Sequence, residues 1–100
     1  MRVVLVCVFG MSTYYVVKAV EKEAKARGID LTLEAIPVSE LPAKVDRFDL
    51  VLLGPQVRYK QEQVAKIAAG AGKKMLPIPP DLYAMTEADR LLDLILANKV

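Results

Sequence analysis

The residues with the clearest potential for covalent chemistry lie together in one short segment, Cys7-Val8-Phe9-Gly10-Met11-Ser12-Thr13. Cys7 is the only cysteine in the chain, so it cannot form an internal disulfide and remains a free thiol in a reducing compartment. The thiolate form of such a residue is a nucleophile. The alternative interpretation is that Cys7 is a small buried residue at the end of a strand, with Ser12 and Thr13 serving only as helix caps.

The same segment has the composition of an anion-binding turn. It connects an apolar run to a helical pattern, and the N–H groups of a first helical turn have no partner within their helix. Gly10 allows the backbone to curl around an anion, and Ser12 and Thr13 offer hydroxyl groups. The same unpaired N–H groups also stabilise a negative charge on sulfur. The sequence therefore predicts that the pKa of Cys7 lies below its ordinary value of about 8.5.

Residue types exclude several related loops. A nucleotide-binding P-loop requires a lysine, a dinucleotide fingerprint requires three spaced glycines, and a thiol redox pair requires a second cysteine. The nearest alternative is the Cys-x5-Arg loop of cysteine phosphatases and arsenate reductases, but Thr13 stands at the arginine position. Threonine lacks the two-pronged donor that stabilises charge during transfer to water. The sequence therefore predicts a phosphocysteine that persists until another acceptor takes the phosphoryl group.

Composition restricts the partners and cofactors. The chain has no histidine, so a phosphohistidine donor would belong to another protein. One cysteine without histidine makes a metal site improbable, and we expect no cofactor. The net charge is +2 with scattered basic residues, which does not favour nucleic acid.

Hydrophobic patterning predicts alternating strands and helices. Strands are expected over residues 2–6, 31–36, 49–53 and 74–78. Helices are expected over 13–27 and 59–71, with a short one over 39–45 and a last one capped by Thr86 with Asp89. Gly28 is expected to end the first long helix. The order predicts an α/β fold in one domain over residues 1–100, with a doubly wound four-stranded parallel sheet of order 2-1-3-4 and helices on both faces, flavodoxin-like or phosphotyrosine-phosphatase-like.

In such a sheet, ligands bind beyond the carboxyl ends of the strands where the strand order reverses. That point lies between the first and third strands, so residues 7–13 and 54–59 should adjoin. No apolar run reaches the ~20 residues that span a bilayer, and the apolar start of the chain is too short for a secretion signal. We therefore expect a cytoplasmic location.

Two segments together resemble a known family. Val3-Val4-Leu5-Val6-Cys7-Val8-Phe9-Gly10-Met11-Ser12-Thr13 resembles the phosphocysteine loop, with signature C-x-x-G-M-S-T, of enzyme IIB components from the lactose/cellobiose (chitobiose) class of the bacterial sugar phosphotransferase system. Asp49-Leu50-Val51-Leu52-Leu53-Gly54-Pro55-Gln56-Val57-Arg58-Tyr59 resembles that family's strand followed by Gly-Pro-Gln and an aromatic residue. The resemblance covers nearly the whole chain. One departure is Val8-Phe9, where the family often has Ser-Ala, and this departure bears on partner docking or substrate choice.

The resemblance implies roles for individual residues. Cys7 would be the phosphoacceptor. The cradle for the phosphoryl group would be the backbone of Val8, Phe9, Gly10, Met11, Ser12 and Thr13. The neighbouring wall would consist of Gly54, Pro55, Gln56, Tyr59 and Tyr83. The four wall residues within the segment 54–59 could instead form only a turn and the start of a helix. Phe9 and Met11 could lie either in a docking face around Cys7 or in the core.

The resemblance also implies a reaction and partners. A phosphohistidine on a IIA protein would give its phosphoryl group to Cys7, which would pass it to a disaccharide such as a β-glucoside held by a membrane IIC transporter. The chain would then be cytoplasmic and peripherally associated with that transporter. A cysteine phosphatase or arsenate reductase, and a non-catalytic anion-binding regulatory domain, remain as alternatives.

Overall fold

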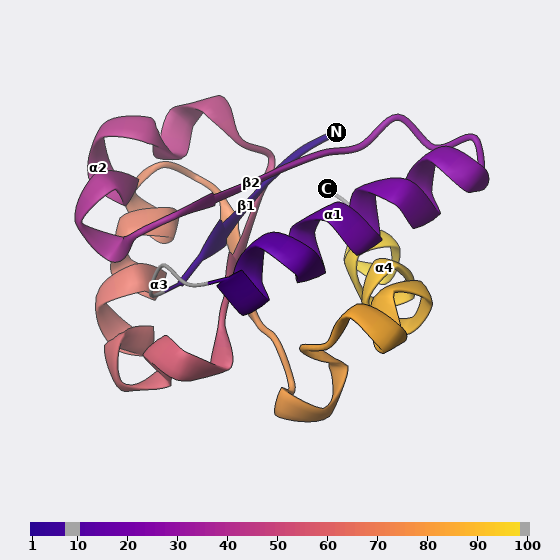
Figure 1. Cartoon of the computed structure of the whole chain (residues 1–100). Coiled ribbons are helices and arrows are strands. Elements are labelled where there is room, and N and C mark those ends of the chain that lie inside the picture. The colour runs from indigo at the N-terminus through magenta and orange to yellow at the C-terminus, as the bar shows by residue number, and fades with distance from the viewer. Residues whose placement is uncertain (8–10, 99–100) are drawn as a thin grey trace.

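The computed structural model describes residues 1–7 and 11–98, and strands alternate with helices along it (Figure 1). The strands are β1 (Arg2–Val6), β2 (Thr32–Ile36), β3 (Leu50–Leu53) and β4 (Lys74–Pro77). The α-helices are α1 (Met11–Ala26), α2 (Leu41–Lys44), α3 (Gln61–Gly70) and α4 (Ala88–Ala97). Short 3-10 turns are η1 (Val38–Glu40), η2 (Val45–Arg47), η3 (Pro55–Lys60), η4 (Pro80–Leu82) and η5 (Met85–Glu87). None of these helices is long and apolar enough to cross a bilayer.

The four strands form one parallel sheet in the order β2-β1-β3-β4. In its register, Val3 of β1 pairs with Leu33 of β2 on one side and with Leu50 of β3 on the other. The central strands β1 and β3 are therefore adjacent although they are distant in the sequence. This arrangement confirms the predicted sheet order and the doubly wound connectivity.

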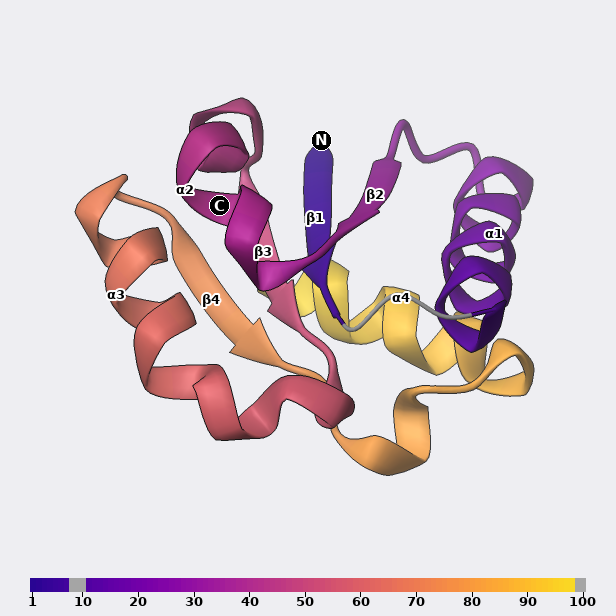
Figure 2. The ribbon, with the colours of Figure 1, turned by 60° about the vertical axis from the view of Figure 1, so that its left-hand side comes forward.

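Helices cover both faces of the sheet, with α1 and α4 on one face and α2 and α3 on the other (Figure 2). Alternate residues of β1 point into the two resulting cores. Val3 and Leu5 pack with residues of α1 and α4, whereas Val4 and Val6 pack with residues of α2 and α3. Burial on both faces explains why the strand is an unbroken apolar run and not an alternating one.

Gly28 ends α1, as predicted. Its φ of +71° is a left-handed conformation that glycine adopts at little cost. The turn lets the N–H of Ile29 donate to the Ala24 carbonyl at 2.9 Å, which satisfies an acceptor near the end of the helix. The chain can then reverse direction and enter β2.

Three predicted helix starts are wrong, and the first of these helices, α1, begins at Met11, two residues before the expected Thr13. The helix expected from Tyr59 is a 3-10 turn until Lys60, and its α-helical part begins at Gln61. Thr86 does not cap α4, because the residue before that helix is Glu87 and no side chain caps it. Thr86 lies inside the turn η5, which a bond from the N–H of Glu87 to the Ala84 carbonyl at 3.0 Å closes. The short helix expected over 39–45 is present as η1, α2 and η2 in succession.

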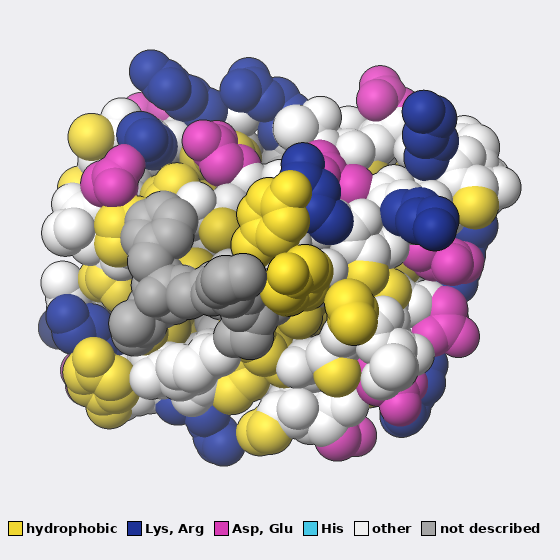
Figure 3. Space-filling model, in the orientation of Figure 1, with side chains coloured by type: hydrophobic (Ala, Val, Ile, Leu, Met, Phe, Trp, Pro, Cys, Tyr) yellow, Lys and Arg dark blue, Asp and Glu magenta, His cyan; other side chains and the backbone are white. Residues whose placement is uncertain are grey.

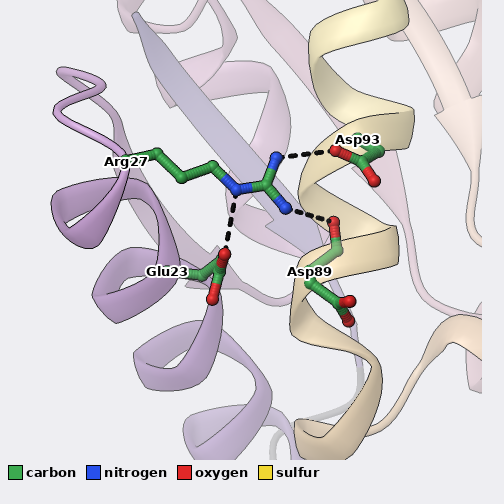
Figure 4. Close-up of polar contacts among 4 residues, drawn as sticks. All are labelled: Glu23, Arg27, Asp89 and Asp93. Carbon is green, nitrogen blue, oxygen red and sulfur yellow. Dashed lines mark hydrogen bonds and ion pairs between the residues drawn. The ribbon is translucent and has the colours of Figure 1, made fainter.

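Arg27 ties the end of α1 to α4 (Figure 4). Its Nε donates to Glu23 Oε2 at 2.9 Å on α1, and its Nη1 donates to Asp93 Oδ1 at 2.6 Å on α4. Its Nη2 donates to the backbone oxygen of Asp89 at 3.2 Å. The planar guanidinium thus makes three directed bonds to two helices, a geometry that an ammonium group cannot reproduce.

We expect Arg27→Gln to lower the melting temperature, and the loss to shrink at high salt because screening weakens the ion pairs in the native protein. Lys66→Gln is the matched control, since Lys66 and Glu62 are 3.8 Å apart and their side chains are 78% and 89% exposed. An exposed pair of this kind contributes little. Thermal melts at low and high salt measure both changes. Equal losses for the two variants would contradict the structural role of Arg27.

Candidate functional site

Cys7 and Gly54 lie at the carboxyl ends of the two central strands. The N–H of Cys7 donates to the Ile36 carbonyl at 3.1 Å, and the N–H of Gly54 donates to the Val6 carbonyl at 2.8 Å. A Cβ atom on residue 54 would lie 3.2 Å from that Val6 oxygen, so the absence of a side chain permits the close approach. The thiol-bearing residue is 1% exposed. The ends of β1, β2 and β3 therefore meet around Cys7, as the predicted switch point requires.

A set of polar side chains adjoins the thiol. Thr13, on the first turns of α1, is 2% exposed and is the one buried polar residue among those whose burial the structure describes. Its hydroxyl is 2.5 Å from the hydroxyl of Tyr83, 70 residues later in the sequence. The Thr13 hydroxyl also lowers the pKa of Cys7, and the Gln56 side chain lowers the pKa of Tyr83, so each lies near the group that it affects. Four of the predicted site residues are thus brought together.

The predicted direction of the Cys7 pKa is wrong. Burial raises the pKa of the thiol from its ordinary value, and the smaller influence of the Thr13 hydroxyl lowers it. A thiolate next to a hydrophobic sheet end loses hydration, and this loss outweighs one hydrogen bond. Burial likewise raises the pKa of Tyr83, and the smaller effects of the Thr13 and Gln56 side chains lower that pKa. Both groups therefore hold their protons at neutral pH.

We expect the rate of Cys7 alkylation to rise with pH to a midpoint above about 8.5, the value for an ordinary thiol. The same chain in denaturant should give the ordinary midpoint, which serves as the control. The pKa of the thiol is raised only in the native chain. The stability that the buried, protonated thiol contributes is therefore complete below about pH 8.5 and is lost as the pH rises through the native pKa. A native midpoint at or below that of the denatured chain would contradict this.

A cavity of about 210 Å³ adjoins Cys7. It is lined by Cys7, Pro37, Val38, Ser39, Val57, Tyr59 and Lys60. Cys7 and Tyr59 are site residues that the sequence predicts, whereas it gives no such prediction for Ser39 or Lys60. The signal for Ser39 was available, because it follows β2 at the same sheet edge as Cys7, and parallel strands end at one edge. Lys60 adds a cationic group to the same cavity.

Other predicted site residues fall partly outside the described part of the chain. Val8, Phe9 and Gly10 lie outside the described residues, so their cradle role stays a prediction. Met11 and Ser12 open α1, which places the start of that helix directly after the segment. Pro55 begins η3 next to Gly54. The predicted docking face around Val8, Phe9 and Met11 also remains a prediction.

Large apolar side chains for which the sequence predicts no role are exposed near the start of α1. Tyr14 and Tyr15 are 58% and 45% exposed, and Met85 of η5 is 56% exposed. Figure 3 shows hydrophobic side chains gathered on the face that carries the N-terminal end of α1. Their exposure could not be read from the sequence, because a helical pattern of mixed apolar residues does not by itself say which face is covered.

Comparison with known proteins identifies the family. The family model described as "PTS system, Lactose/Cellobiose specific IIB subunit" matches residues 2–94. A galactose-specific EIIB component of the phosphotransferase system from Lactococcus lactis subsp. cremoris (strain MG1363) is 33% identical over 95 residues, covering 90% of this chain and 88% of the relative. A cellobiose-specific EIIB component from Lactococcus lactis subsp. lactis (strain IL1403) has the same identity and coverage.

Solved structures agree. The cellobiose-specific phosphotransferase IIB component from Borrelia burgdorferi is 37% identical with a TM-score of 0.79, and the match covers 99% of this chain and 94% of that one. The lactose-specific IIB component domain of the phosphoenolpyruvate:carbohydrate phosphotransferase system from Streptococcus pneumoniae is 16% identical with a TM-score of 0.86, over 97% and 95% of the two chains, a likeness of fold alone. This chain, with its flavodoxin-like sheet, therefore belongs to the lactose/cellobiose-specific IIB subunits of the sugar phosphotransferase system.

Proposed function

We propose that this chain carries a phosphoryl group on Cys7, accepting it from a phosphohistidine of a IIA protein and giving it to a disaccharide held by a IIC transporter. The observation that carries the proposal is the position of the only cysteine, at the carboxyl end of the central strand β1 and just before α1. In a doubly wound sheet this position is where ligands bind. Membership of the IIB family supports the same chemistry.

The surroundings of Cys7 suit a phosphoryl group. The free N–H groups and dipole at the start of α1 favour a negative charge, and the backbone from Val8 to Thr13 would form the cradle. Lys60 lines the cavity next to Cys7 and adds positive charge. Gly54, Gln56 and Tyr83 would complete the wall. Transfer between such groups depends mostly on positioning and on charge stabilisation.

The sugar and the place of action belong to the same proposal. The family description names lactose and cellobiose, and one relative is cellobiose-specific, so we infer a disaccharide of the cellobiose, chitobiose or lactose type. The chain would work in the cytoplasm, bound transiently to the membrane transporter. The exposed Tyr14, Tyr15 and Met85 give it an apolar face at the start of α1 for transient docking.

The test is intact mass spectrometry after incubation with a phosphorylated histidine-containing IIA protein of this class. We expect the mass of one added phosphoryl group, located on the peptide that contains Cys7, and its loss when membranes with a matching IIC transporter and a disaccharide are added. Labelling at another residue, or no labelling by any lactose- or cellobiose-class IIA protein, would refute the proposal. Rapid turnover of a generic phosphomonoester would instead favour a cysteine phosphatase.

A further inference from the structure

The cavity of about 210 Å³ beside Cys7 has both apolar and polar lining residues. Val38 and Val57 are buried there and belong to the core between the sheet and the helices α2 and α3. Ser39 and Lys60 supply a hydroxyl and an ammonium group to the same cavity. A water molecule occupies about 30 Å³ in the liquid, so the space is large enough for a phosphoryl group attached to the Cys7 sulfur.

Two short turns hold Ser39 and Lys60 at this edge of the sheet. Ser39 lies in η1, which follows β2, and Lys60 ends η3, which follows β3. Both of these strands pair with β1, so the two turns flank the end of the strand that carries Cys7. A bond from the N–H of Glu40 to the Pro37 carbonyl at 3.1 Å closes η1. The hydroxyl and the ammonium group are therefore carried by folded turns on the two neighbours of β1.

The positive charge of Lys60 is not neutralised by another side chain of the described residues. None of their carboxylates lies within ion-pair distance of it. Glu62, two residues later, pairs with Lys66 at 3.8 Å. Glu40 of η1 pairs with Lys44 at 2.8 Å. A cavity whose lining contains one cation and no carboxylate attracts anions.

The position of Lys60 suits a bound anion better than the free thiol. Its Nζ lies 5.8 Å from the centre of the Tyr59 ring, which also lines the cavity and is 75% exposed. Lys60 is not among the groups that shift the pKa of Cys7. Its charge therefore acts beyond the sulfur, where the oxygens of a phosphocysteine would lie. A phosphorylated side chain carries a charge of about −1.5 to −2 at pH 7.

Resting on the proposed function, we propose that Ser39 and Lys60 form a binding site for the oxygens of the phosphoryl group on Cys7, at the end of the core that α2 and α3 cover. The Lys60 ammonium group acts as a point charge against the phosphoryl oxygens, and the Ser39 hydroxyl donates a hydrogen bond to one of them. The backbone at the start of α1 holds the same group from the other helical layer. The site stabilises the phosphorylated chain relative to the free thiol.

The first test compares the alkylation of Cys7 by anionic iodoacetate and by neutral iodoacetamide at low salt. Both reagents react with the thiolate, so the ratio of their rates reports the charge that an incoming anion meets and not the amount of thiolate. We expect Lys60→Gln to lower the ratio of the iodoacetate rate to the iodoacetamide rate about fivefold, the effect of one unit charge at about 4 Å in water. Lys60→Arg should restore the ratio. Lys74→Gln is the matched control, because Lys74 begins β4 at the opposite edge of the sheet.

The second test is the equilibrium between a phosphorylated IIA protein and this chain, followed by intact mass. We expect Lys60→Gln to lower the ratio of phosphorylated to free chain by more than in the alkylation test, because a phosphoryl group carries about twice the charge of a carboxylate. Ser39→Ala should lower the ratio less, since a hydroxyl group contributes no net charge. Lys74→Gln should match the unchanged chain.

Melting curves that match the unchanged chain exclude a folding defect in these variants. The same ratio of iodoacetate to iodoacetamide rates in Lys60→Gln and in the unchanged chain would overturn the proposed binding site. Equal phosphorylated fractions in these two chains would overturn it as well. Absence of phosphorylation in the unchanged chain would refute the proposed function instead, and the alkylation ratio would then decide by itself whether Lys60 attracts anions to Cys7.

Discussion

Replacing Cys7 by serine is expected to reduce phosphoryl transfer to sugar by a factor on the order of 10³ or more, as is typical for the loss of a covalent nucleophile. A serine hydroxyl ionises far less readily than a thiol, and it lies in the same buried setting that already raises the pKa of Cys7. The measurement is sugar phosphorylation in membranes that contain a matching IIC transporter, supplied with IIA protein and this chain. The phosphorylated intermediate should also be absent from the intact mass spectrum.

The fold should survive this change. Serine is close in size to cysteine, and the Cys7 backbone is held by its bond to the Ile36 carbonyl at 3.1 Å. Thr32→Ser is a matched control, because it changes one small side chain at the far end of β2 and should leave the transfer rate unchanged. Transfer at the native rate by the Cys7→Ser variant would remove the basis for the proposed function.

The second large effect concerns the lifetime of phosphocysteine. We expect phosphorylated Cys7 to hydrolyse about 10² to 10³ times more slowly than the intermediate of a Cys-x5-Arg phosphatase, because the loss of one transition-state donor has an effect of this size in other enzymes. Thr13 occupies the arginine position. It is 2% exposed and bonded to Tyr83 at 2.5 Å, so no two-pronged donor is presented from this position.

The measurement is the decay of the adduct by mass spectrometry after the IIA donor has been removed. The denatured phosphorylated chain provides the control, since it reports the intrinsic stability of phosphocysteine in water. The native adduct should decay no faster than the denatured one. Loss of the native adduct within seconds at neutral pH would indicate a hydrolase and would contradict the relay that we propose.

Much of the fold follows from local sequence patterns. The apolar run from Val3 to Val6 is buried on both sheet faces, as its unbroken apolar pattern predicts. Gly28 ends α1 because the chain makes a left-handed turn there, and a glycine after a helical pattern predicts such a turn. The same reasoning placed Cys7 and Gly54 at adjoining strand ends, because sheet order and the carboxyl-end rule depend on element order and on connection length.

Local signals were insufficient where backbone and tertiary contacts compete with them. Thr86 and Asp89 have the spacing of a capping pair, yet Thr86 lies inside the turn η5 and Glu87 takes the position before α4 without a side-chain cap. The bond from the N–H of Glu87 to the Ala84 carbonyl closes that turn and keeps Thr86 out of the cap position. Nothing in the spacing of the sequence states which of the two will form.

The chemical state of the site was decided only by the tertiary structure. The sequence by itself determined that Cys7 is the single thiol and that it stands between a strand and a helix, and from this a lowered pKa was predicted. The folded chain raises that pKa instead, because packing removes water from the sulfur. Packing also brings Tyr83 to Thr13 across 70 residues and Lys60 to the cavity beside Cys7. Desolvation and long-range contacts depend on where distant segments meet, and no local pattern of residue types encodes that distance.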